Sequence, residues 1–286
     1  MPIQAEMPWP KYPLVYEINT RVWLAELSAK RGQRITLDKV PDDEIERIAR
    51  HGFHAIWLMG VWTTGAEPIA IARSHPGLQE EFRQALQNMT TEDIIGSPYA
   101  ISHYGVSPTL GGNEGLAEFR EKLAKSGLRL MLDFVCNHVA RDHWLVHKQP
   151  EVFISGTESD LARDPNSFFK TPEGNIIANG RDPYFAAWTD TAQINYAQSP
   201  GREAMKLKLR SMAAQCDGLR CDMAMLILPE IIERIWGTRL GPKPVKSSFW
   251  REAIHDVMSV HPNFLFMGES YWNLEWQLHQ DGFHFT

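Results

Sequence analysis

The stretch Cys216-Asp217-Gly218-Leu219-Arg220-Cys221-Asp222 decides the fold of this 286-residue chain. Its apolar and small residues predict a short buried strand. Because strand side chains alternate between the two faces of a sheet, Arg220 and Asp222 share one face and Leu219 points to the other. An arginine this close lowers the pKa of an aspartate and keeps it ionised, which suits a nucleophile better than an acid. The alternative interpretation is a structural ion pair.

Two further apolar runs also end in a carboxylate. Residues 128–132 lead to Asp133, and residues 264–268 lead to Glu269. Three strands therefore deliver three carboxylates, and a (β/α)₈ barrel assembles its active site from groups at the C-terminal ends of successive parallel strands. The sequence thus predicts an α/β fold of the (β/α)₈ TIM barrel class.

The rest of the chain alternates strands with helices, as such a barrel requires. We expect strands at 14–19 and 54–59, a sixth strand that has only begun at Phe283, and helices at 42–52, 78–89, 113–127, 202–214, 230–236 and 248–260. Asp42 and Asn113 are the expected N-caps, and Val22-Trp23-Leu24 leads into an expected polar loop that ends at Val40-Pro41. A closed barrel needs more strands than these, so we expect a barrel that is incomplete at the C-terminus and inactive within residues 1–286.

Within residues 61–112, one group of apolar side chains repeats at helical spacing. Its members are Leu78, Phe82, Ala85, Leu86 and Met89. This spacing is typical of an amphipathic helix. We therefore expect these residues to belong to the core and not to line a binding site.

Periodicity disappears after His138 and returns at about Pro200, and turn signals replace it. A segment of roughly 60 residues without a clear element is too long for a simple connection. The sequence therefore predicts a small inserted subdomain at 139–200 after the third strand, with 1–138 and 201–286 as the two parts of the barrel. The aromatic residues of the insertion either fold it or line a cleft.

Composition limits the classes of function. The chain is 43% hydrophobic and 22% charged, which is typical of a globular protein. A net charge of −6 without a run of Lys and Arg argues against a nucleic-acid partner, and no stretch predicts a signal peptide or a membrane span. Cys136, Cys216 and Cys221 lie in or beside apolar runs, which predicts buried thiols in a reducing compartment, so we expect a cytoplasmic protein.

The three carboxylates suggest sugar transfer by a nucleophile and an acid. In retaining glycosidases one carboxylate attacks the anomeric carbon, and a second, roughly 5 to 5.5 Å away, protonates the leaving oxygen. Arg220 would keep Asp222 charged, whereas the apolar run before Glu269 would raise the pKa of that carboxyl. The 10 tryptophans, 13 phenylalanines and 7 tyrosines also suit sugar rings, although core packing accounts for most of them.

Several motifs, in order along the chain, resemble those of the α-amylase family, glycoside hydrolase family thirteen. Asp133-Phe134-Val135-Cys136-Asn137-His138 is similar to the family's first region, and Gly218-Leu219-Arg220-Cys221-Asp222 is similar to the second, which holds the nucleophile. Gly268-Glu269 matches the third, which holds the acid/base. Tyr99 resembles the tyrosine that stacks on the sugar being cleaved, and Gln193-Ile194-Asn195-Tyr196 resembles a motif near the end of the family's inserted domain.

The resemblance implies a retaining enzyme acting on α-linked glucans or α-glucosides, with Asp222 as nucleophile and Glu269 as acid/base. It further implies a set of substrate-binding residues, which are Tyr99, Asp133, His138 and Arg220. Two of these have structural alternatives, because a histidine at 138 could belong to the core and Asp133 could merely pair with Arg220.

The resemblance also names Asn137 as a candidate calcium ligand, although its side chain could simply satisfy loop backbone. The family's usual Lys-His after the nucleophile is replaced by Met223-Ala224-Met225-Leu226, which removes a histidine whose carbonyl often completes the calcium site. His103 stands where an aspartate is common. Because calcium requires six or more oxygen ligands, we expect it to bind weakly or not at all, and we expect no other cofactor.

A cluster of His138, Asp142, His143 and His147 offers another alternative, because such residues bind zinc. The histidine spacing is five residues and then four, and no glutamate stands between them as in the helix motif of metalloproteases. The spacing argues against zinc.

Two hypotheses from different classes therefore stand. The first is a catalytic α-amylase-type domain that acts by double displacement on a carbohydrate substrate. The second is a non-catalytic glycan-binding or regulatory relative, or an inactive fragment. The family's fourth region, a His-Asp pair that supplies a third catalytic carboxylate, would discriminate between them, and it is absent from these 286 residues.

Overall fold

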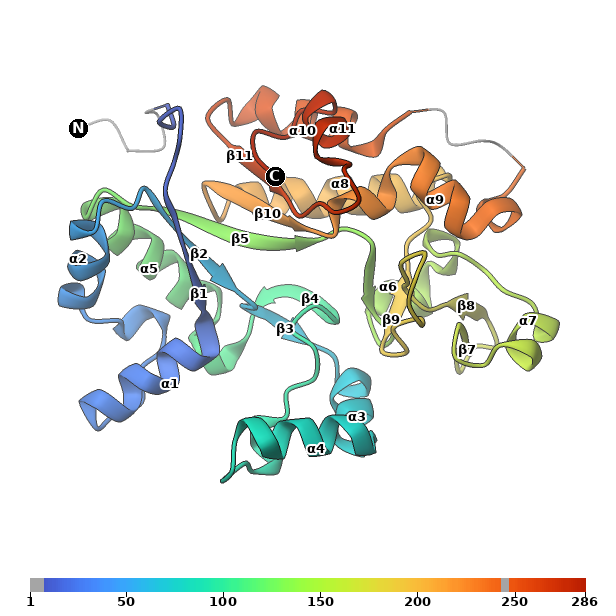
Figure 1. The fold of residues 1–286 in the computed structure, drawn as a ribbon, viewed down its shortest axis with the longest axis horizontal. Helices are drawn as coiled ribbons and strands as arrows, with labels where there is room; N and C mark the ends of the chain where they lie inside the picture. Colours follow the sequence, from blue (N-terminus) through green and yellow to red (C-terminus); the bar gives the residue numbers. More distant parts are fainter. Residues whose placement is uncertain (1–7, 243–246) are drawn as a thin grey trace.

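The structure is a computed structural model that describes residues 8–242 and 247–286 (Figure 1). A five-stranded sheet forms its centre. In spatial order the strands are β1 (Val15–Asn19), β2 (Ala55–Met59), β5 (Arg129–Val135), β10 (Gly218–Asp222) and β11 (Leu265–Gly268). All neighbours pair in parallel. The predicted strands and the α/β class are confirmed, and closure into a barrel stays a prediction.

Helices connect successive strands of this sheet, as Figure 1 shows. They are α2 (Asp42–Arg50) before β2, α5 (Gly112–Lys125) before β5, α8 (Ser199–Ala213) before β10 and α10 (Phe249–Val260) before β11. Each buries apolar side chains at helical spacing, such as Leu116, Phe119 and Leu123 of α5. The short helix predicted at 230–236 is α9 (Pro229–Trp236).

The remaining elements lie between these units. They are β3 (Trp62–Thr64), α3 (Ala66–Ser74), α4 (Pro76–Ala85), β4 (Ile101–Val106), β6 (His138–Ala140), α6 (Trp144–Lys148), α7 (Glu158–Arg163), β7 (Phe168–Lys170), β8 (Ile176–Ala178), β9 (Thr191–Gln193) and α11 (Glu275–Gln280). Short 3₁₀ turns occur at Leu37–Lys39, Thr91–Asp93, Pro108–Leu110, Pro150–Val152, Ala224–Ile227 and Gly237–Leu240.

The expected polar loop after β1 is wrong, because α1 (Thr20–Arg31) occupies much of it. Asn19 caps this helix by accepting a hydrogen bond from the backbone N of Val22 at 3.4 Å. Leu24 and Leu27 are buried on its inner side. Polar residues surround these two leucines in sequence, so the apolar spacing that predicts a helix is weak here.

Both expected N-caps are also wrong. Helix α2 begins after Pro41, which makes no side-chain cap bond, and Asp42 is its first residue. Helix α5 begins after Gly111, and the side chain of Asn113 instead accepts a hydrogen bond from Val106 N at 2.8 Å. The two side chains had the right chemistry for capping but lie one or two residues inside the helix.

Helix α4 differs from expectation in a way that matters below. It forms near the predicted place, but none of its residues is buried. The apolar side chains expected in the core, such as Phe82 and Leu86, border a cavity instead. The prediction that they are core residues is therefore wrong.

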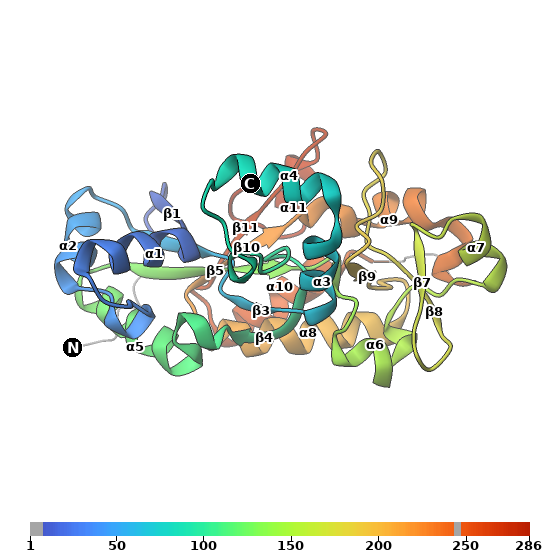
Figure 2. The same cartoon turned by 90° about the horizontal axis from the view of Figure 1, so that it is seen from below.

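Residues 139–200 contain more structure than the sequence suggested. Strands β6 and β9 pair antiparallel, as do β7 and β8, with α6 and α7 beside them. In both views this segment forms the end of the molecule opposite α2 (Figures 1 and 2). Its strands have only three residues each, too short for an alternating pattern to be recognised. The domain boundaries at 139 and 200 stay predictions.

At the C-terminal end, the backbone after α11 returns to the sheet. Phe285 forms an isolated parallel bridge with Met267 of β11, and its carbonyl accepts a hydrogen bond from Gly268 N at 2.9 Å. The chain therefore pairs with β11 where the sixth strand was expected, although it forms a bridge and not a strand. In the described part of the chain, no helix is both long and apolar enough to cross a membrane.

An aromatic cluster around Trp250 joins α10 to the sheet and to the C-terminal segment. Trp250 of α10 is fully buried, and its ring lies 6.0 Å from that of Phe134 and 4.8 Å from that of Phe283. Its Nε1 donates to the carbonyl of Ala224 at 2.8 Å. One side chain thus connects β5, the turn after β10 and the C-terminal segment.

We predict that Trp250→Ala lowers the free energy of unfolding by about 3–5 kcal/mol, because it opens a cavity and leaves a buried carbonyl without its donor. Trp276→Ala, at a side chain that is 73% exposed, should change it by about 0.5 kcal/mol or less. Urea unfolding followed by circular dichroism measures both. Equal effects would contradict the assigned role of Trp250.

Candidate active site

The carboxylates predicted from sequence meet at one edge of the sheet. The register places Arg220 of β10 opposite Asp133 of β5 and opposite Met267 of β11. Asp222 ends β10, and Glu269 follows β11 directly, with its backbone N bonded to Cys221 O at 3.0 Å. Because the strands are parallel, all these groups lie at their C-terminal ends.

Arg220 is the cation that joins the three acidic residues. Its Nη1 lies 2.8 Å from Asp222 Oδ1 and 3.9 Å from Asp133 Oδ1, and its Nη2 lies 2.7 Å from Glu269 Oε2. The prediction that Arg220 and Asp222 share a face is confirmed. A planar guanidinium suits this role, because it offers donors in several fixed directions at once.

Asp133 is the most enclosed of the three carboxylates. Its oxygens accept hydrogen bonds from Trp57 Nε1 at 3.1 Å and from Gly60 N at 2.9 Å. Burial raises the pKa of the Asp133 carboxyl to about 6, and these donors together with Arg220 oppose the rise. Gly60 has a φ of +73°, and a Cβ at this position would lie 3.0 Å from Pro98, so glycine is required where the backbone approaches Asp133.

Asp222 departs from the electrostatics expected from sequence. Burial raises the pKa of its carboxyl to about 7, while the adjacent Arg220 lowers it and Glu269 adds to the rise. The expectation that Arg220 alone holds the pKa of Asp222 low is therefore wrong. The reason is that one cation is shared among three carboxylates in a site with little water.

Glu269 accepts hydrogen bonds from several donors. Besides Arg220, these are Met223 N at 2.7 Å and the Tyr271 hydroxyl at 2.9 Å. Met223 has a φ of +44°, a left-handed conformation uncommon for a residue with a long side chain. That conformation directs its N–H to Glu269. Glu269 is thus held by a cation, a backbone N–H and a hydroxyl.

Two aromatic rings flank the cation. The guanidinium carbon of Arg220 lies 5.1 Å from the Trp57 ring centroid and 5.7 Å from that of Tyr99. Such contacts hold a guanidinium in place by attraction to the ring faces. Tyr99 is half-buried, and burial raises the pKa of its hydroxyl. The structure thus brings Tyr99 to the predicted cluster.

His138 and Asn137 lie at the start of the 139–200 segment. His138 is buried, hydrogen-bonds to the backbone of Tyr99, and packs its ring 5.0 Å from Trp188. Burial lowers its pKa to about 4, which keeps the imidazole neutral at neutral pH. His138 therefore joins the cluster through Tyr99.

Asn137 does not offer a free oxygen to a cation. Its Oδ1 accepts from Gln193 Nε2 at 2.9 Å, and its Nδ2 donates to Gln193 Oε1 at 3.1 Å. Calcium requires six or more oxygen ligands, and this reciprocal amide pair does not fit that requirement. Among the residues 8–242 and 247–286, no three His, Cys, Asp or Glu side chains are grouped to hold a metal.

The four residues weighed as zinc ligands have separate partners. His143 Nδ1 accepts from Leu145 N, and His147 contacts Glu173. Asp142 accepts from the backbone N of Glu67 at 3.0 Å. Each contact uses one side of the residue, and Asp142 Oδ1 and His143 Nε2 are buried without a hydrogen-bond partner among the described residues.

Exposed aromatic side chains extend the site away from Arg220. Tyr184, from the 139–200 segment, packs its ring 4.9 Å from Trp272, and the Arg234 guanidinium lies 5.0 Å from the Tyr184 ring. Trp272 follows Tyr271, which bonds to Glu269. Tyr184 is 55% exposed and Trp272 is 37% exposed. We call Tyr184, Tyr271 and Trp272 the aromatic platform.

Sequence reasoning missed several members of the site. Trp57 was hidden in a continuous apolar run, although strand alternation pairs it with Met131 on the face of Asp133. Tyr271 lies two residues beyond Glu269, a spacing that could have suggested it. The backbone N of Met223 carries no sequence signal, because its role depends on a backbone conformation.

Comparison with known proteins gives a consistent result. A family model described as the catalytic domain of alpha amylase matches residues 43–280. Alpha-amylase MalA of Haloarcula japonica is 23% identical over 271 residues, which are 92% of this chain and 30% of that protein. Alpha-1,4-glucan:maltose-1-phosphate maltosyltransferase 2 of Streptomyces coelicolor is 24% identical over 193 residues, 63% of this chain and 23% of that protein. The chain thus spans less than a third of either curated relative.

A solved structure shares the fold. The alpha-amylase from Lactobacillus plantarum superposes with a TM-score of 0.57 at 20% identity, over 98% of this chain and 50% of that one.

We predict that Asp222→Asn stabilises the fold more at pH 8 than at pH 4. Because the native carboxyl binds its proton more tightly than the unfolded one, its contribution favours folding below its ordinary pKa of 3.8 and is lost as the pH rises toward about 7. The gain at pH 8 should be on the order of a few kcal/mol. Unfolding of both proteins across pH measures it, with the exposed Asp43→Asn as control. A pH-independent difference would contradict the raised pKa.

Proposed function

The chain belongs to the α-amylase family, as its motifs indicated, and from this premise we propose that it is catalytic. The proposed activity is that of a retaining glycoside hydrolase or transglycosidase acting on α-linked glucans or α-glucosides. One observation carries the proposal. The Arg220 guanidinium joins Asp133, Asp222 and Glu269 at the C-terminal ends of three adjacent parallel strands.

The proposed reaction is a double displacement. A carboxylate oxygen of Asp222 attacks the anomeric carbon while the glycosidic C–O bond breaks, and the proton of Glu269 moves to the leaving oxygen. A water or acceptor hydroxyl then gives its proton to Glu269 and attacks the same carbon, which releases Asp222. Atoms balance over the two steps, and each carboxyl returns to its starting form.

The first displacement requires a charged Asp222 and a protonated Glu269. Burial raises the pKa of Asp222 to about 7, which opposes its charged form. A sugar bound over Asp222 with a hydroxyl that donates to this carboxylate would favour the charged form.

We assign the other residues of the cluster to substrate binding. Tyr99 would stack on the sugar, His138 would donate a hydrogen bond to a sugar oxygen, and Asp133 would hold Arg220 in place. The β1, β2, β5, β10 and β11 sheet would be the first five strands of a (β/α)₈ barrel, with 139–200 as the insertion after its third strand. The consecutive parallel order of these strands supports that reading.

A non-catalytic glycan-binding relative is the second candidate. The observation that favours it is that Arg220, Met223 N and the Tyr271 hydroxyl all contact Glu269, the residue that would have to protonate the leaving oxygen. Such a protein would bind the same sugars through the aromatic platform and would form no covalent intermediate. The two candidates therefore differ in the adduct and agree in carbohydrate binding.

We predict separate effects for the two carboxylates in preparations of the protein that cleave α-glucosides. Asp222→Asn should abolish the adduct that 5-fluoro-α-glucosyl fluoride forms, because no nucleophile remains. Glu269→Gln should still form the adduct, because fluoride leaves without a proton, but should lose about 10²–10⁴-fold in activity on maltooligosaccharides. Intact-protein mass spectrometry follows the adduct.

Asp43→Asn, at a carboxylate outside the cluster, is the matched control and should behave as the parent. An adduct in the Asp222→Asn protein would sink the assignment. Carbohydrate binding without any adduct in the parent protein would favour the glycan-binding relative.

We also predict that Trp272→Ala weakens the binding of maltoheptaose by about tenfold, because a flat aromatic face packs against the apolar face of a sugar ring. Isothermal titration calorimetry on the 286-residue chain measures the affinity. Trp276→Ala, at a more exposed tryptophan with no assigned contact to the platform, should leave it unchanged. Equal losses in both variants would rule out the platform as a binding surface.

A further inference from the structure

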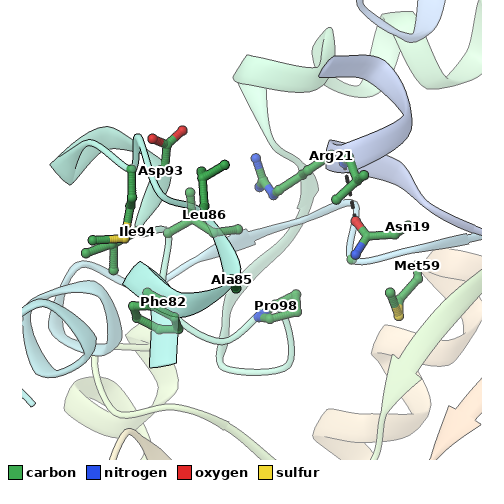
Figure 3. Close-up of a pocket in the computed structure, with 14 residues that line it drawn as sticks. Asn19, Arg21, Met59, Phe82, Ala85, Leu86, Asp93, Ile94 and Pro98 are labelled. Carbon is green, nitrogen blue, oxygen red and sulfur yellow. Dashed lines mark hydrogen bonds between the residues drawn. The ribbon is translucent and has the colours of Figure 1, made fainter. Parts of the chain in front are cut away.

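A cavity of about 320 Å³ lies between α4, the start of α1 and the end of β2 (Figure 3). Most of its wall is apolar, with Val22, Met59, Phe82, Leu86 and Ile94 among the lining residues. Its size falls in the range of small-molecule sites, and a few polar groups among apolar walls are typical of them. The polar side chains of the lining are Asn19, Arg21 and Asp93.

The apolar side chains of α4 are not packed into the core. Phe82 and Ala85 of this helix line the cavity together with the next residue, Leu86, and none of the helix residues is buried. Leu86 remains 44% exposed. An amphipathic helix normally buries this face against other side chains, and burial of such groups stabilises by about 25 cal/mol per Å². An apolar ligand would supply that burial.

Arg21 indicates the polar part of such a ligand. Arg21 lines the cavity, and its Nη1 donates to Thr109 Oγ1 at 3.1 Å. That hydroxyl is a neutral partner, and a charged acceptor would bond more strongly to the guanidinium. In Figure 3 the Arg21 side chain extends over the cavity toward Leu86.

Asp93 does not compensate Arg21. Its Oδ2 accepts from the backbone N of Thr90 at 2.7 Å and from the Thr90 hydroxyl at 2.8 Å. This capping box commits Asp93 to the turn that carries it. Figure 3 places it on the far side of Leu86 from Asn19. The positive charge of Arg21 is thus available to a ligand.

We propose that this cavity binds a small aryl or alkyl carboxylate. Its apolar group lies between α4 and Pro98, and its carboxylate pairs with the guanidinium of Arg21, which lines the cavity. An anion suits the site better than a neutral acceptor, because a hydrogen bond between two charged groups is the stronger one. The inference does not depend on the proposed glycosidase activity, since no residue of the carboxylate cluster takes part.

Two short segments connect the cavity with the carboxylate cluster. Gly60 lines the cavity, and its backbone N holds Asp133. Pro98 also lines the cavity, and the next residue, Tyr99, faces Arg220. The chain around residue 60 and around residues 98–99 therefore contributes both to the cavity and to the surroundings of the carboxylate cluster.

The test uses three probes with one apolar group, which are 4-phenylbutyrate, 4-phenylbutanol and 4-phenylbutylamine. On the 286-residue chain, isothermal titration calorimetry should show the carboxylate binding at least about tenfold more tightly than the alcohol, and the amine binding most weakly. Arg21→Met should remove the difference between carboxylate and alcohol. Arg83→Met is the matched control, because Arg83 lies on α4, is exposed and pairs with Glu80 outside the lining.

Ala85→Phe tests the cavity itself. Ala85 is exposed on α4, so the larger side chain should be tolerated by the fold and should fill the space that the ligand needs. It should reduce the affinity for all three probes at least tenfold, with a melting temperature close to that of the parent. Equal affinities for carboxylate and alcohol, unchanged carboxylate binding in Arg21→Met, or no binding by the parent would each overturn the proposal.

Discussion

One guanidinium placed among three carboxylates is the constraint on which the rest of the structure depends. Arg220 reaches Asp133, Asp222 and Glu269 only because β5, β10 and β11 are adjacent, parallel and in a register that puts residues 133 and 220 opposite each other. A slip of one residue in β10 would turn Arg220 to the other face, where Leu219 and Cys221 are buried. The apolar register of the strand and the electrostatics of the site are therefore fixed together. Burial raises the pKa values of Asp133 and Asp222, and the single cation only partly opposes the rise.

The backbone around Glu269 is held in conformations that non-glycine residues adopt only when their surroundings impose them. Met223 has a φ of +44°, and Trp272 and Asn273 have φ values of +65° and +61°. Such residues cluster at functional sites, where the fold compensates their cost of about 1–3 kcal/mol each. Here the left-handed turn at Met223 aims an N–H at Glu269, and the turn at 272–273 accompanies the contact of Trp272 with Tyr184 of the 139–200 segment. Glu269 Oε2 is thus held by a backbone N–H as well as by Arg220.

Sequence reasoning reached the sheet and most of the carboxylate cluster because both depend on local patterns. Apolar runs of strand length predict the five strands, and a carboxylate at the end of a run predicts its place at the sheet edge. It did not reach α1, whose apolar spacing is diluted by polar residues, or the caps, which depend on where a helix begins to within one residue. Trp57, Tyr271 and the N–H of Met223 depend on tertiary placement. The pKa of Asp222 was misjudged because the sequence shows the nearby arginine but not the burial that outweighs it.

The same balance explains how a buried cluster of this kind can respond to a ligand. Arg220 binds Asp222 through Nη1 and Glu269 through Nη2. A bound group that donates a hydrogen bond to Asp222 would share the role of Arg220 at that carboxylate. Asp133 accepts hydrogen bonds from Trp57 Nε1 and Gly60 N, one at each oxygen, and these donors hold the carboxylate in place. A hydrogen bond from a bound group to Asp222 would favour the charged form of that carboxyl and oppose the effect of burial on its pKa. Because both oxygens of Asp133 are already engaged by donors, Asp222 is the buried carboxyl of the two on which such a group can act.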